Sequence, residues 1–110
     1  MGNVFVKSGH VRDILSDATT TVTGAWQFKD APKAAIQATV VGTGAVTATI
    51  VIEASNDGTY ALATVIGTIT LSGTTSDSDG FTTDAPWKFI RARITAISGT
   101  SATVNVTASA

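Results

Sequence analysis

The sequence contains no cysteine and a single histidine among 110 residues. Without cysteine there are no disulfides and no thiolate metal ligands, and cysteine usage does not indicate whether the protein resides in a reducing or an oxidising compartment. His10 has no second histidine with which to share a metal. Ser8 and Asp13 lie near it in sequence, but neighbours on a strand alternate faces and do not form a catalytic triad with it. We therefore expect no catalytic residue, no metal and no cofactor, and the sequence predicts a protein that is not an enzyme.

Charge is also scarce. Seven Lys and Arg residues are balanced by eight Asp and Glu residues, which gives a formal net charge of -1. Binding to a phosphate backbone requires clustered cations, which are absent, so we expect no nucleic-acid partner. No apolar run approaches membrane-spanning length, and residues 1–17 lack the order of charges and apolar residues of a secretion signal. We expect no membrane partner and a protein made in the cytoplasm.

Helix signals are almost missing, whereas β-branched residues alternate with a period of two, which favours strands. Between residues 47 and 54 one face is apolar and predicted to be core, and it comprises Ala48, Ile50, Ile52 and Ala54. A second apolar row comprises Ile90, Ala92, Ile94 and Ala96, opposed by Phe89, Arg91, Arg93 and Thr95. Val104 and Val106 form a third row. These rows predict half-buried antiparallel strands.

The other predicted strands cover residues 3–7, 11–15, 19–23, 25–29, 34–41 and 62–71, with Gly67 at a bulge. Turn chemistry separates them at residues 42–44, 56–58 and 98–100, and residues 73–80 are predicted to be a polar loop. The fold class is therefore all-β, an antiparallel β-sandwich or jelly roll of about seven to nine short strands. We expect one domain, with a β-sandwich over residues 17–110 and an N-terminal arm or edge strand over residues 1–16.

Two acidic segments are candidates for a metal or catalytic site. Asn56-Asp57-Gly58 lies where a hairpin has to reverse, which favours a turn over a metal or catalytic site, and Glu53 is predicted to be a solvated charge. Residues 75–80 imitate the first half of a calcium loop. Thr75 replaces the leading carboxylate, however, and Pro86 stands where a bidentate Glu is required. A flexible polar loop is the expected structure there.

Aromatic residues have two interpretations. Trp26 and Phe28 share one face of a predicted strand, as do Trp87 and Phe89, and such rings either cap the ends of the core or anchor a protein interface or a sugar ring. Phe89 shares its face with two arginines, which is typical of interfaces, although the arginines could instead pair with Asp30, Asp77 or Asp84. The N-terminal arm could add a strand to a neighbour. The candidate interface residues are Val4, Phe5, Val6, His10, Arg12, Trp26, Phe28, Trp87, Phe89, Arg91 and Arg93.

Residues 33–106 resemble a group of small β-sandwich structural proteins of tailed bacteriophages, most closely the capsid decoration, or cement, proteins of short-tailed phages. The resemblance lies in the hairpin at residues 55–58, the segment "DAPWKFIRAR" at 84–93 and the closing segment at 99–104. Tyr60 stands where such proteins carry an aromatic residue after the Asp-Gly turn. The same hairpin is also seen in discoidin-like sugar-binding modules, and residues 1–32 lie outside the resemblance.

The resemblance implies a jelly roll on the outside of an icosahedral shell that bridges coat subunits and stabilises the shell, without a cofactor. The expected partner is the major capsid protein of a phage. We expect a homo-oligomer on the capsid, located in the virion and assembled in the host cytoplasm. The alternative is a tail-associated or carbohydrate-binding β-sandwich module that uses Trp26 or Trp87 as a platform.

Overall fold

The computed structural model describes residues 5–6, 11–29, 33–58 and 63–109. Strands in this part of the chain belong to one sheet, and no helix is present there, so none that could span a membrane. The strands are β1 (Phe5–Val6), β2 (Val11–Ala18), β3 (Val22–Thr23), β4 (Gln27–Lys29), β5 (Ala34–Ser55), β6 (Thr64–Gly73), β7 (Ser76–Thr83) and β8 (Phe89–Ser109). The predicted all-β class is confirmed.

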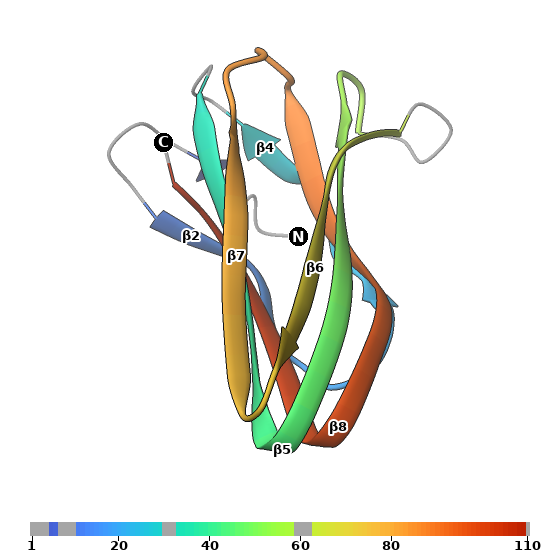
Figure 1. Cartoon of the computed structure of the whole chain (residues 1–110). Helices are drawn as coiled ribbons and strands as arrows, with labels where there is room; N and C mark the ends of the chain where they lie inside the picture. The colour runs from blue at the N-terminus through green and yellow to red at the C-terminus, as the bar shows by residue number, and fades with distance from the viewer. Residues whose placement is uncertain (1–4, 7–10, 30–32, 59–62, 110) are drawn as a thin grey trace.

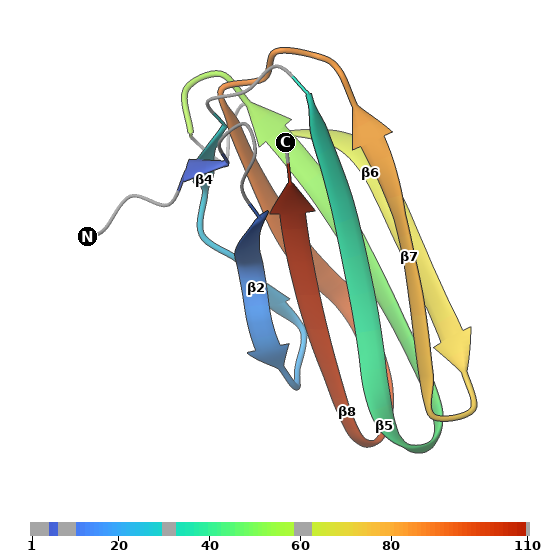
Figure 2. The same ribbon diagram turned by 90° about the vertical axis from the view of Figure 1, so that its left-hand side faces the viewer.

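Two long strands, β5 and β8, form the centre of the fold. They pair antiparallel from Ala35 opposite Ser109 to Ser55 opposite Phe89. Both bend back on themselves at the lower end in Figures 1 and 2. The bends coincide with register shifts and with positive φ angles at Gly44 (78°) and Gly99 (125°). The predicted turns at 42–44 and 98–100 are therefore bends through which strand pairing continues, because glycine tolerates these angles.

The shorter strands extend the two arms of this bent pair. On the first arm of β5 (residues 34–41) lies β7, and on the last arm of β8 (residues 102–109) lies β2. The second arm of β5 (residues 46–55) pairs with β6, and the first arm of β8 (residues 89–97) pairs with both β3 and β4. These pairs are antiparallel, whereas β1 runs parallel to β4 over two residues.

The predicted alternation is confirmed in the core. Ile50, Ile52 and Ile90 are fully buried, and so are Val104 and Val106. Inward residues from both arms of β5 and β8 belong to one cluster, consisting of Ile14, Ala34, Ile36, Ala38, Val40, Val46, Ala48, Ile50, Ile52, Ala54, Ile69, Leu71, Ile90, Ala92, Ile94, Ala102, Val104, Val106 and Ala108. Burial of this apolar surface is the main favourable contribution to folding.

Ala96 departs from the predicted core row, because it is exposed. Thr49 pairs with Ala96, but the next residue, Ile50, pairs with Ile94, so Thr95 is an extra residue in β8. A bulge of this kind reverses the inward and outward positions beyond it. Ile97 consequently packs against the core in place of Ala96.

The prediction of a polar loop over residues 73–80 is wrong from Ser76 onward, because β7 pairs with β5 from Ala34 to Val41. Asp77 and Asp79 pair with inward-facing Val40 and Ala38, so both carboxylates stand on the inner side of an edge strand. Charges placed this way discourage the addition of another strand. Asp77 also accepts a hydrogen bond from the Ser72 N–H at 2.9 Å, which braces the β6–β7 connection.

The predicted bulge at Gly67 is confirmed. Ile52 pairs with Gly67 and Glu53 with Val65, which leaves Ile66 as the extra residue of β6. A Cβ atom at Gly67 would collide with the ring of Phe81 from β7. The missing side chain therefore lets an aromatic ring from one edge strand lie on the backbone of the other.

Candidate functional site

The turn after β5 has the structure expected from its sequence. Gly58 has a φ of 71°, which favours glycine. The buried Ser55 hydroxyl accepts hydrogen bonds from the backbone N–H groups of Asp57 (3.1 Å) and Gly58 (3.2 Å) and donates one to Asp57 Oδ1 (2.9 Å). The polar groups of this segment thus hold the turn, as predicted. Tyr60, which carried part of the family resemblance, lies outside the described residues.

An ion cluster lies on the outward face of the first arm of β8. Arg91 Nε donates to Glu53 Oε1 at 2.8 Å, and Arg93 Nη2 donates to Glu53 Oε2 at 3.3 Å. Glu53 and Arg91 are directly paired across β5 and β8 and are only 5% and 6% exposed. The prediction of Glu53 as a solvated charge is therefore wrong. The two arginines share Glu53, whereas the sequence had suggested Asp30, Asp77 or Asp84; Asp30 lies outside the described residues.

Aromatic side chains cover this cluster. The Trp26 ring lies over Arg91, with 4.5 Å between the guanidinium carbon and the ring centroid, in the range of a cation–π interaction. Phe28 and Phe89 meet edge to face, with centroids 5.6 Å apart. Trp87 instead packs against the apolar core. Five of the predicted interface residues thus lie on one outer surface. Together with Glu53 we call them the arginine cluster: Trp26, Phe28, Phe89, Arg91 and Arg93.

The inner face of β4 is polar. Gln27 and Lys29 are 6% and 2% exposed, while Trp26 and Phe28 on the other face are half-buried. Lys29 Nζ donates to the Ala85 carbonyl at 2.9 Å, which ties β4 to the segment that leads into β8. Burial, and secondarily the charge of Lys88, lowers the pKa of Lys29 below its ordinary value. The predicted alternation of β4 is correct, but the prediction did not say which of its two sides is buried.

The N-terminal candidates are placed only in part. Val4 and His10 lie outside the described residues. Phe5 and Val6 form β1, opposite Phe28 and Lys29 of β4. Arg12 is exposed on β2, opposite Ala108. Residues 11–16 of the predicted arm or edge strand therefore run along β8 in the same sheet.

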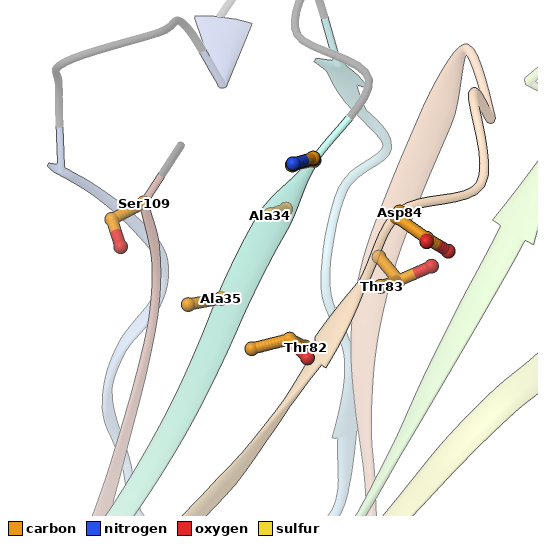
Figure 3. A pocket seen from close by; sticks show the side chains of 7 residues that line it. Ala34, Ala35, Thr82, Thr83, Asp84 and Ser109 are labelled. Atoms are coloured by element: carbon orange, nitrogen blue, oxygen red, sulfur yellow. The ribbon is translucent and has the colours of Figure 1, made fainter.

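A shallow depression lies where β5 begins and β7 and β8 end. Figure 3 shows its lining, which consists of Lys33, Ala34, Ala35, Thr82, Thr83, Asp84 and Ser109. These residues bring small side chains and hydroxyls together, with Lys33 and Asp84 as the charged members. The sequence offered no signal for this depression, because its residues come from three strands that meet only in the folded sheet.

A broad uncharged surface extends from this depression along the outward side of β7, β5 and β8. Cross-strand pairing places its residues in register, and we call them the hydroxyl face: Ala35, Gln37, Thr39, Val41, Ser76, Ser78, Gly80, Thr82, Thr103, Asn105, Thr107 and Ser109. Ser78 Oγ accepts a hydrogen bond from Gln37 Nε2 at 3.0 Å and lies 2.9 Å from Thr39 Oγ1. The face is polar, and hydroxyls of β5 and β7 are linked across it.

Within the described residues no group of three or more His, Cys, Asp or Glu side chains is arranged to hold a metal ion. No family model, curated protein or solved structure matches this chain.

Proposed function

We propose that this protein is a bacteriophage virion structural protein of the capsid decoration, or cement, type. In this role the bent sheet is a β-sandwich of the jelly-roll kind that binds the major capsid protein on the outside of the shell. It acts there as a homo-oligomer and stabilises the shell without catalysis. The proposal combines the family resemblance of residues 33–106 with the surfaces of the fold.

The hydroxyl face is the observation that carries the proposal. Its twelve residues include no charged side chain and span three strands of a continuous ladder. Such a face makes many weak hydrogen bonds and van der Waals contacts at little desolvation cost for ions. In a homo-oligomer each copy repeats the same contact with the shell, so weak individual contacts add up to tight binding. A stiff sheet with a neutral face suits that role.

The alternative role, as a tail-associated or carbohydrate-binding module, has less support from the arrangement of the tryptophans. One face of the Trp26 ring is occupied by Arg91, and Trp87 packs against the core. A sugar-binding platform requires a ring face that is open to the ligand. A glycan array with the wild-type protein, Trp26→Ala and Trp87→Ala would promote this alternative if sugar binding were found and lost in either variant.

Quantifying the protein in purified virions tests the proposal directly. A decoration protein repeats with the coat lattice, so we expect hundreds of copies per particle, roughly in step with coat subunits. Denaturing gels calibrated with the purified protein measure this number. Absence from the particle, or presence at only a handful of copies, would overturn the proposal.

A further inference from the structure

A second depression lies beside the arginine cluster. Its lining comes from two neighbouring segments and consists of Thr21, Val22, Thr23, Arg93, Ile94 and Thr95. Thr23 pairs directly with Arg93, so the hydroxyl and the guanidinium share the outward face. The Thr21 and Thr23 side chains are exposed, and Val22 is 40% exposed. The depression thus joins one cation, three threonines and two apolar residues, of which Val22 is the exposed one.

Arg93 retains hydrogen-bonding capacity in this depression. Its side chain is 33% exposed, and its contact with Glu53 uses Nη2 at the long distance of 3.3 Å. Arg93 Nε is buried and has no hydrogen-bond partner among the described residues. The better-aligned contact of Glu53 is with Arg91, at 2.8 Å. A guanidinium has five N–H donors in a fixed fork, and most of those of Arg93 are not used by Glu53.

We infer that this depression, the Arg93 site, binds a side-chain carboxylate of a protein partner. A second carboxylate would accept from the unused Nη donors of Arg93, and Thr23 and Thr21 would donate to its other oxygen. Charge complementarity supports this occupant, because the Arg93 side chain is 33% exposed and is the one charged member of the described lining. The inference depends on the proposed function only for the identity of the partner, which would be the coat protein.

The neighbouring side chains favour a protein acid over an acidic sugar. Val22 pairs with inward-facing Ile94 and lies on the opposite face of β3 from Thr23, so its half-exposed apolar surface borders the depression at the edge of the strand, where it suits the methylene groups of Asp or Glu. The nearest tryptophan, Trp26, already lies over Arg91 and so does not offer that face of its ring to a sugar. A protein side chain therefore matches the chemistry of the depression better than a sugar acid does.

The test is an NMR titration of the full chain with two peptides whose ends are blocked and therefore uncharged, Ac-Gly-Glu-Gly-NH2 and Ac-Gly-Gln-Gly-NH2. The readouts are the Arg93 Nε–Hε signal, assigned by its loss in Arg93→Lys, and the backbone amides of Thr23 and Thr95. We expect the glutamate peptide to shift all three signals saturably. The affinity of the glutamine peptide should be at least about tenfold lower, because a charge-assisted hydrogen bond is lost.

Matched variants make the result specific. Arg93→Gln should abolish the shifts at Thr23 and Thr95, whereas Lys33→Gln, an equal change of charge at the other depression, should leave them unchanged. Thr23→Val keeps the ion cluster intact and should weaken binding severalfold, so it tests the site even if Arg93→Gln folds poorly. Equal shifts with both peptides, no shifts at all, or wild-type binding by Arg93→Gln would each overturn the inference. Tighter binding of methyl glucuronide than of the glutamate peptide would overturn it in favour of an acidic sugar.

These outcomes are independent of the virion measurement. The peptide titration concerns the isolated protein, so the Arg93 site can fail while copies are still counted in hundreds per particle. Conversely, a functional Arg93 site on a protein absent from virions would leave the carboxylate inference standing and remove only the coat protein as its partner.

Discussion

Replacing Ile52 with Asp is expected to abolish folding. Ile52 is fully buried in the second arm of β5, with Ala92 and Gly67 opposite it on the neighbouring strands. An aspartate there would have to bury a charge without a partner, at a cost of several kcal/mol on top of the lost apolar burial. Natural domains have only about 5–15 kcal/mol of stability. Far-ultraviolet circular dichroism and thermal unfolding should show no cooperative native state at 25 °C.

Thr47→Asp is the matched control, because it introduces the same side chain into the same strand at an exposed, outward position. We expect its unfolding free energy to change by no more than about 0.5 kcal/mol. An Ile52→Asp variant with an unchanged melting temperature would show that the inward and outward faces of β5 have been assigned the wrong way round.

Replacing Glu53 with Ala should give the second-largest effect. Both arginines of the cluster donate to Glu53, and Arg91 is only 6% exposed. Removing the carboxylate breaks a buried ion pair by taking away the partner that both guanidiniums contact, a change that typically costs about 3–5 kcal/mol. Urea unfolding of the wild type and of Glu53→Ala measures the difference. Asp13→Asn, at an exposed carboxylate of β2, should change stability by about 0.5 kcal/mol or less.

The double variant Glu53→Met, Arg91→Met separates the burial of charge from the loss of a contact. Replacing a buried pair with apolar residues of similar size is often neutral or stabilising, so the double variant should recover most of the stability lost in Glu53→Ala. If Glu53→Ala costs less than about 0.5 kcal/mol, the cluster behaves as an exposed ion pair. That result would contradict the burial described here.

The core was predictable because it depends on local alternation. The rows at Ala48–Ala54, Ile90–Ile94 and Val104–Val106 each repeat with the period of a strand, and each row is buried in the structure. The turn at Asn56-Asp57-Gly58 was predictable for a similar reason, since its chemistry lies within a few residues. What local patterns could not show is that β5 and β8 continue through their glycine bends.

The misassigned residues depend on contacts between distant parts of the chain. Glu53 is on the outward face, as alternation requires, but it is buried there in contact with both arginines, one of which lies under the Trp26 ring. For β7 the reason is different, because an edge strand with hydroxyls outward and aspartates inward has no apolar alternation. Ala96 was misplaced by one extra residue, Thr95, which no sequence pattern marks.

The candidate surfaces were predictable to different degrees. Phe89, Arg91 and Arg93 were singled out because they share one strand face, and the structure adds the carboxylate that joins the two arginines. Residues of the hydroxyl face are individually ordinary, and their importance arises from the register of β5 with β7 and β8. Sequence patterns find a distinctive residue more easily than a surface built from common ones.

β5 and β8 form one continuous ladder that joins both arms into a single rigid body. Native-state amide hydrogen exchange measures whether the two arms open together. Inward residues of both arms, such as Ile36, Ile50, Ile94 and Val104, should exchange with a common opening free energy, within about 1 kcal/mol of global unfolding. An opening free energy several kcal/mol lower in one arm than in the other would show two independent units and refute the continuous ladder.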